Sequence, residues 1–311
     1  MVLGIDPTVD YVFKRLFGDP KHVAVLIHLL NAIFEGLFRV VGVEILTPFL
    51  EKDFADDKLG ILDLRIRDSD GRTYNLEMQT TVPAGLPNRL AYYLSSMYCE
   101  QLREGDSYAM LTPAICVCFM NRVLFSKTKS FHTRFRLCSL EEKLVLTDHL
   151  EVHVLELPKY NGTIAELPLA SPKERWAYFL QHATQMTIAE IGELLPEPAF
   201  VEAGGVLDMI SKTPEERLHY ELRVKAMRDQ KSNVEAARLE GREEGREEGR
   251  EEGLEKGLEK GLEEGKWLGQ IQLLQSLLGD SVSTLDELRK WDLDRLKRTA
   301  ESLQTRLRGR T

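Results

Sequence analysis

The sequence has few cysteines, no excess of basic residues and no long apolar run. Its four cysteines form no Cys-x-x-Cys pair, so a disulfide scaffold or a structural zinc site is not expected, and we predict reduced core thiols. Acidic residues outnumber basic ones by 50 to 41, which excludes a globally basic nucleic-acid-binding protein but not a local basic cleft. The longest apolar runs, near 23–30 and 113–120, are far shorter than the roughly 20 residues that a bilayer requires. With no secretory leader evident either, we expect a cytoplasmic protein and no membrane partner.

The negative charge is concentrated in one stretch of the chain. Residues 240–266 carry 11 acidic and 6 basic side chains, so they hold −5 of the net charge of −9, and the remainder of the chain is close to neutral. With 311 residues, of which 43% are hydrophobic, the chain is long enough for a substantial core and about two domains.

The first part of the chain shows an alternation of helical and strand-like patterns. Apolar residues at spacings of three and four predict helices, and period-two alternation or continuous apolar runs predict strands. The predicted order is αβββαβ, with a helix within 11–37, strands at 40–49, 60–67 and 72–80, a helix at 88–104 and a strand at 114–120. The polar turn at 68–71, which contains a glycine, predicts a hairpin between the second and third strands.

Further elements follow this core. The patterns predict strands at 131–137, 143–146 and 150–157 and helices at 173–182, 188–195 and 215–239, with breaks at Pro196, Pro198 and Gly204-Gly205. We therefore divide the chain into a globular body (1–170), a helical annex (171–239), a charged glycine repeat (240–269) and a small helical segment (270–311).

A glycine recurs at every fourth position from Gly241 to Gly269, and two interpretations of this repeat remain open. Eight interior glycines cost a helix roughly 6–8 kcal/mol relative to alanine, which favours a solvated spacer of marginal helicity. The alternative is a helix that associates with others through its small residues. Leucines after the repeat predict an amphipathic helical hairpin that binds a partner or a second copy of the chain.

The predicted hairpin carries polar residues along one face. Asp63, Arg65 and Arg67 alternate with apolar residues in one strand, and Glu77 and Gln79 do so in the next. If paired positions sum to 140, Asp63 lies across from Glu77, at about 5 Å. Two carboxylates this close repel each other unless they share a proton or a cation.

Such a pair has the hard oxygen ligands that a magnesium site for phosphodiester hydrolysis needs. The ion lowers the pKa of a bound water and neutralises charge in the transition state. Acidic pairs without a metal also occur across exposed hairpins, so spacing alone leaves both interpretations open.

Four segments resemble a known family. They are DYVFKRLFG (10–18), GILDLRIRDSDGRTYNLEMQ (60–79), NRLAYYLSSMYCEQLREGDSY (88–108) followed by PAICVCF (113–119), and LELPKY (155–160). With an aspartate on the second strand and Glu-x-Gln on the third, the first half of the chain resembles the PD-(D/E)XK nuclease superfamily. Within it, the pattern is similar to the recombination-promoting nuclease (Rpn) family, also called PD-(D/E)XK family transposases.

The resemblance implies both a fold and an activity. The fold is α/β (α+β), a restriction-endonuclease-like αβββαβ core with a C-terminal helical annex and a helical tail. The activity is that of a divalent-metal-dependent DNA endonuclease linked to recombination, in which Asp63 and Glu77 bind Mg²⁺ or Mn²⁺. Gln79 stands where the superfamily has a catalytic lysine, and an amide can orient water but supplies no positive charge.

The missing lysine keeps a second function open. In that alternative the protein is a catalytically weak or inactive nuclease-fold chain that acts as an oligomeric DNA- or protein-interaction module. In both cases we expect a homo-oligomer formed through the C-terminal helices.

Other polar residues are weaker candidates. Asp10 and Lys14 either border the cleft or form an i,i+4 pair. Arg89 either touches a phosphate or is an ordinary surface residue, and His149 and His153, which share a predicted strand face, are more often structural than metal ligands. Candidates for non-specific DNA backbone contacts are Arg65, Arg67, Lys127, Lys129, His132, Arg134 and Arg136.

Overall fold

The computed structural model describes residues 1–47 and 64–309. The chain divides into two compact units, Met1–Asp229 and Gln230–Thr311, which we describe separately. Among the described residues, no helix has both the length and the apolar character needed to cross a bilayer.

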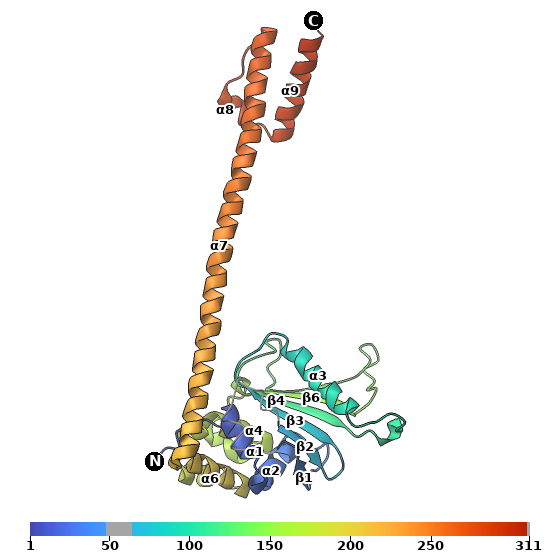
Figure 1. Cartoon of the computed structure of the whole chain (residues 1–311), viewed down its shortest axis with the longest axis vertical. Coiled ribbons are helices and arrows are strands. Elements are labelled where there is room, and N and C mark those ends of the chain that lie inside the picture. Colours follow the sequence, from blue (N-terminus) through green and yellow to red (C-terminus); the bar gives the residue numbers. More distant parts are fainter. Residues whose placement is uncertain (48–63, 310–311) are drawn as a thin grey trace. The chain divides into compact units, whose positions relative to one another are not determined.

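The first unit is built on a mixed sheet of six strands in the order β1-β2-β3-β4-β6-β5 (Figure 1). The strands β1, β2 and β3 are antiparallel neighbours, β3, β4 and β6 run parallel, and β5 pairs antiparallel with β6 at the other edge. Their bounds are β1 Val43–Ile45, β2 Leu64–Asp68, β3 Thr73–Gln79, β4 Ala114–Met120, β5 His132–Arg136 and β6 Leu150–Glu156.

One helix covers one face of this sheet. The parallel strands β3 and β4 require a crossover, which α3 (Leu86–Cys99) provides. Its buried positions recur at helical spacing and pack on β4 and β6 in a cluster with Cys116, Cys118 and Met120; they are Leu86, Leu90, Leu94 and Met97. The interior of β4 is apolar throughout because helices lie on both of its faces.

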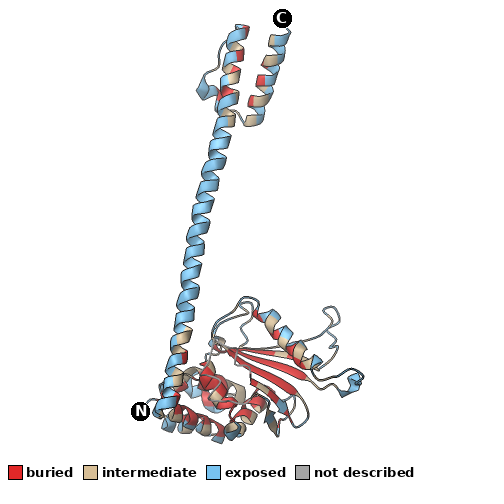
Figure 2. Cartoon of the chain, viewed as in Figure 1, coloured by how far each residue is buried: buried red, intermediate tan, exposed pale blue. Residues whose placement is uncertain are grey.

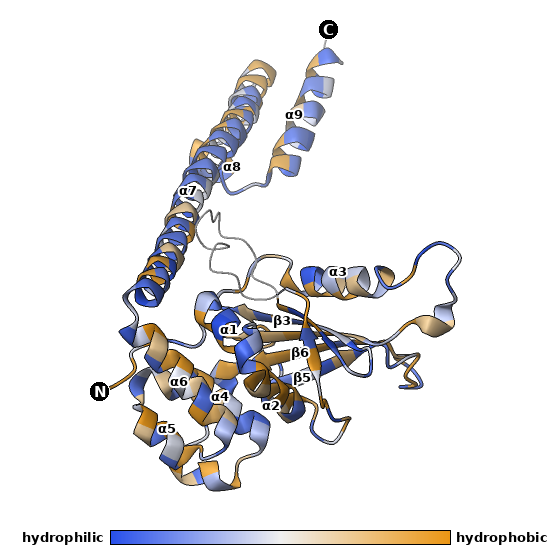
Figure 3. Cartoon of the chain, turned by 60° about the horizontal axis from the view of Figure 1, so that its bottom comes forward, coloured by the Kyte–Doolittle hydropathy of each residue, from blue (hydrophilic) through white to orange (hydrophobic). Residues whose placement is uncertain are grey.

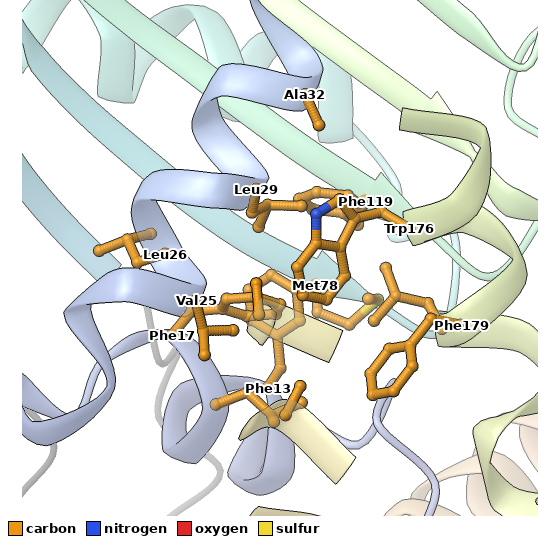
Figure 4. Close-up of a cluster of buried hydrophobic side chains, with 14 of the residues drawn as sticks. Phe13, Phe17, Val25, Leu26, Leu29, Ala32, Met78, Phe119, Trp176 and Phe179 are labelled. Atoms are coloured by element: carbon orange, nitrogen blue, oxygen red, sulfur yellow. The ribbon is translucent and has the colours of Figure 1, made fainter. Parts of the chain in front are cut away.

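The opposite face packs against α1 (Asp10–Phe17), α2 (Val23–Ile33), α4 (Pro172–His182) and α6 (Pro198–Lys212). Figure 4 shows the centre of this core, where Phe17 and Trp176 meet edge to face with ring centroids 5.5 Å apart. Figure 2 shows buried residues concentrated in the sheet and these helices. The helices that follow the sheet in sequence therefore complete the core of the first unit.

Several predicted boundaries are wrong in detail. The opening helix is two helices, because Asp19 caps a 3₁₀ turn at Pro20–His22 between α1 and α2. The helix predicted at 88–104 ends at Cys99, since the side chain of Gln101 bonds to the backbone of Thr112 instead. In place of the strand predicted at 143–146, the structure has only an isolated bridge from Cys138 to Val145.

The predicted break at Gly204-Gly205 is also wrong. Both glycines lie inside α6, which packs on α5 (Ile188–Leu194). A Cβ on Gly204 would lie 3.1 Å from the Ile191 side chain, so this glycine permits a close helix contact and does not end a helix.

The glycine repeat is helical. It lies within α7 (Pro214–Leu278), which is exposed on all sides and hydrophilic over residues 240–262 of the repeat (Figures 2 and 3). Marginal helicity is therefore not what the structure shows. The predicted hairpin after the repeat is present, because α8 (Leu285–Leu288) and α9 (Leu293–Arg308) pack on the end of α7 around Ile271, Leu288 and Leu296.

Candidate functional site

The hairpin of β2 and β3 has the predicted register. The observed pairs, from Leu64 with Leu76 to Arg67 with Thr73, all sum to 140. Asp68 forms the turn by accepting hydrogen bonds from the backbone N–H groups of Asp70 and Arg72, both at 2.9 Å. Asp63 lies outside the described residues, so its place opposite Glu77 stays a prediction.

Glu77 lies at the centre of the candidate site. It is only 2% exposed and pairs with Cys118 of β4, on the sheet face that α3 covers. Gln79 Nε2 donates a hydrogen bond of 2.9 Å to Glu77 Oε2. The prediction that Glu77 and Gln79 share one face of β3 is therefore confirmed, and the amide of Gln79 orients the Glu77 carboxylate.

The polar face of β3 is less exposed to solvent than the alternation of polar and apolar residues predicts. Thr73, Asn75 and Glu77 are all at most 8% exposed, because α3 crosses over this face and its end bonds to it through Gln101. Period-two polarity reports which face a residue is on, but it does not report whether a later element covers that face.

Arg89, from the first turn of α3, reaches the same carboxylate. Its Nη2 lies 3.5 Å from Glu77 Oε2, the oxygen that also accepts from Gln79. The Arg89 side chain is 25% exposed, whereas its Nε is buried and has no hydrogen-bond partner within the described residues. Arg89 is therefore more than an ordinary surface residue, and it places a positive charge at the site.

Most of the predicted basic surface is engaged within the protein. Arg65 donates to Glu100 at 2.9 Å, and Arg67 lies 3.9 Å from Glu44. Arg134 and Arg136 both bind the buried carboxylate of Glu151. The exposed remainder is Lys127 and Lys129, which have no ion pair within residues 1–47 and 64–309.

The two histidines predicted to share a face lie on opposite faces. His149 precedes β6, and its Nδ1 lies 3.0 Å from the hydroxyl of Tyr98 on the α3 side. His153 is fully buried against Phe34 of the α2 side. The prediction of a shared strand face is therefore wrong, and the two do not form a ligand pair.

His153 belongs instead to a buried polar chain. Its Nε2 lies 3.0 Å from Glu151 Oε2, and its Nδ1 lies 2.9 Å from His132 Nε2. Burial, with smaller contributions from neighbouring His153 and Lys173, lowers the pKa of His132 to about 4. His132 is therefore neutral at pH 7 and does not attract phosphate.

Asp10 and Lys14 do not form the i,i+4 pair that was one of the two alternatives for them. Asp10 accepts hydrogen bonds of 2.8 Å from Arg223 Nε, and Lys14 is buried at 6% exposure. In the same region Glu216 accepts from Tyr11 at 2.6 Å and from Arg15 at 2.9 Å. Asp10, Tyr11 and Arg15 thus bind α1 to the start of α7.

Glu156 and Lys159 lie in the LELPKY segment but were not among the predicted site residues. Glu156 is fully buried at the end of β6 and accepts from the backbone N–H groups of Leu124 and Phe125 at 2.6 and 2.9 Å. Lys159 Nζ donates to Glu156 at 2.5 Å and to the carbonyl of Phe125 at 2.8 Å. The pair thus holds the loop after β4, and the signal for it was two opposite charges three residues apart beside an apolar strand.

The donor set partly fits a hard divalent ion. Glu77 supplies a buried carboxylate, which is the ligand type that Mg²⁺ prefers. No group of three His, Cys, Asp or Glu side chains able to hold a metal occurs in the described part of the chain, which does not include Asp63. Glu77 alone of the predicted ligands is therefore placed.

Comparison with known proteins gives one family match. Neither a curated protein nor a solved structure matches the chain. The family model of the PD-(D/E)XK nuclease family transposases matches residues 7–237, which include the sheet, the helices on both of its faces and the start of α7. The mixed sheet with its hairpin, crossover helix and parallel strands agrees with that fold. The chain therefore belongs to the PD-(D/E)XK nuclease family transposases.

Proposed function

We propose that the protein is a divalent-metal-dependent DNA endonuclease that hydrolyses phosphodiester bonds. The observation that carries the proposal is the buried Glu77 carboxylate, oriented by Gln79 on the third strand of a PD-(D/E)XK fold. In this proposal Asp63 and Glu77 hold Mg²⁺ or Mn²⁺. The bound ion acidifies a water and stabilises negative charge on the phosphate.

The protein's own residues prepare this site in two ways. The hydrogen bond from Gln79 limits Glu77 to one orientation, so little reorganisation is needed when a cation binds. Burial under α3 keeps water from screening the carboxylate, which strengthens its attraction for a cation. The exposed Lys127 and Lys129 are the proposed contacts to the DNA backbone, and such contacts carry no sequence specificity.

Nicking of supercoiled plasmid tests this proposal. The full chain is expected to nick with Mg²⁺ or Mn²⁺ and to stop when EDTA removes the ion. Asp63→Asn and Glu77→Gln are each expected to reduce the rate by at least about 100-fold, because each removes a charged ligand.

A matched control comes from the same hairpin. Asp70 is an exposed acid in the turn, and its side chain is 56% exposed. Asp70→Asn is therefore expected to nick at the wild-type rate. Undiminished nicking by both site variants would refute the assignment of the ligands.

A second candidate function is an oligomeric interaction module in which the chemistry is lost. Two observations favour it: Gln79 replaces the lysine, and three leucines spaced four apart on α7 are each 67% exposed, namely Leu254, Leu258 and Leu262. This candidate requires no metal-dependent nicking even at low salt. It also requires a smaller assembly by light scattering when the residues after Leu239 are removed. A homo-oligomer through these helices and a cytoplasmic location are compatible with both candidates.

A further inference from the structure

The proposed nuclease site has no lysine at the position of Gln79. Hydrolysis of a phosphodiester develops negative charge on the phosphate oxygens, and a protein cation beside the metal lowers that cost. The nearby Arg65 is bound to Glu100, and Lys159 is bound to Glu156. Arg89, in contrast, contacts the proposed ligand Glu77 itself.

The Arg89 contact differs from the structural ion pairs of this protein. Arg134 binds Glu151 through two nitrogens, at 2.8 and 2.5 Å. Arg89 approaches Glu77 through one nitrogen at 3.5 Å, which is long for a hydrogen bond. The Glu77 oxygen that it approaches already accepts from Gln79 at 2.9 Å.

Arg89 also keeps donors available. A guanidinium has five N–H donors. The N–H of the buried Arg89 Nε donates a hydrogen bond to none of the described residues. One quarter of the side chain remains exposed to solvent. A partly buried guanidinium with an unused donor, held beside a carboxylate, is suited to bind a phosphate in a bidentate manner.

We infer that Arg89 supplies the cation that the superfamily's lysine provides elsewhere. It binds a non-bridging oxygen of the scissile phosphate and stabilises the charge that develops there, while α3 holds it beside Glu77. The site is thus completed by a residue from the crossover helix and not from the third strand. This inference rests on the proposed nuclease function.

The test compares Arg89→Gln and Arg89→Lys in the full chain. Arg89→Gln is expected to lower the single-turnover nicking rate about 100- to 1000-fold, the range for loss of one charge-stabilising donor. Arg89→Lys keeps the positive charge, so its nicking rate is expected to be at least tenfold higher than that of Arg89→Gln. Arg103→Gln is the matched control, because Arg103 is an exposed arginine just after α3, and its rate is expected to equal wild type.

Metal binding gives a readout independent of cutting. Because Arg89→Gln removes a positive charge beside Glu77, Mn²⁺ titrated into the protein without DNA is expected to bind at least as tightly as to wild type. Weaker Mn²⁺ binding would show that Arg89 only organises Glu77, and it would overturn the inference. Equal nicking rates of the Gln and Lys variants would overturn it as well, whether both are active or both inactive.

The two proposals fail in different ways. If Glu77→Gln is inactive while Arg89→Gln nicks within threefold of wild type, the nuclease stands and the role of Arg89 is refuted. If wild type does not nick, both are refuted. Thermal melting identifies a variant that fails to fold, and if Arg89→Gln melts early, Arg89→Met replaces it in the comparison with Arg89→Lys.

Discussion

At the scale of single residues, His132 is held neutral by its surroundings. Its folded-state pKa of about 4 lies below the ordinary value of 6.5, so between these values the unfolded chain binds more protons than the folded chain. Stability therefore rises with pH in this window, and it is lost as pH falls from about 6.5 towards 4. From pH 7 to pH 5 the wild type is expected to lose about 1–2 kcal/mol more unfolding free energy than His132→Gln.

Urea denaturation at the two pH values measures this difference. Burial also lowers the pKa of His28 and His182, so the wild type has further pH dependence in the same direction. The variant keeps those histidines, and subtraction isolates His132. Parallel losses in the two proteins would show that His132 does not titrate below its ordinary pKa.

The sequence predicted which residues share a face within the β2–β3 hairpin. It did not predict the contacts between that hairpin and other elements. Alternation and the turn at Asp68 were sufficient for the register and for placing Glu77 and Gln79 on one face. They could not show that Arg89 reaches Glu77 or that Glu156 binds the loop after β4, because those contacts join residues 12 and 32 positions apart. Such contacts depend on how the elements pack.

At the scale of elements, α7 is helical although the helix propensity of its glycines led us to predict marginal helicity. Apart from Trp267, the residues between the glycines of the repeat are all strong helix formers, namely Glu, Arg, Lys and Leu. Ion pairs at i,i+4 spacing, such as Lys256 with Glu252 at 3.0 Å, add a few tenths of a kcal/mol each. These contributions offset part of the free-energy cost of the glycines. The repeat also lies in the middle of α7, whose first and last parts each pack against other helices.

The remaining cost of glycine gives a prediction. A Cβ at Gly245, Gly249 or Gly253 would meet nothing within 4 Å, so alanine fits at each. Replacing all three is expected to stabilise the helix by roughly 1 kcal/mol per site, and hydrogen exchange of the amides in 241–257 is expected to slow accordingly.

The control for this prediction is a glycine with a packing role. In α6 a Cβ at Gly204 would lie 3.1 Å from Ile191, so Gly204→Ala is expected to speed exchange in α5 and α6. Unchanged exchange in 241–257 in the triple alanine variant would mean that helix opening does not limit exchange there. The packing role of Gly204 also explains why the break predicted at Gly204-Gly205 is wrong, since sequence alone does not distinguish a glycine that ends a helix from one that lets two helices approach.

At the scale of the whole molecule, the first helix depends on a segment about 200 residues later. Asp10 is bound by Arg223, and Glu216 is bound by Tyr11 and Arg15. Arg223 and Glu216 are both at most 8% exposed, so the charges are desolvated and depend on their partners. The family match to residue 237 includes these partners, so the sequence that the family shares continues beyond the sheet and into α7.

This dependence predicts where the chain can be shortened. A chain of residues 1–239 keeps Glu216 and Arg223 and is expected to melt within about 3 °C of the full chain's first unit and to retain metal-dependent nicking. A chain of residues 1–212 loses both partners, leaves Asp10 and Tyr11 without their bonds, and is expected to lose roughly 3–5 kcal/mol of stability. Calorimetry of the two shortened chains measures the difference, and Lys225→Ala, a nearby change outside the ion pairs, serves as the control. Equal melting temperatures of the two chains would contradict the prediction, because α7 would then be an attachment to the fold and not a part of it.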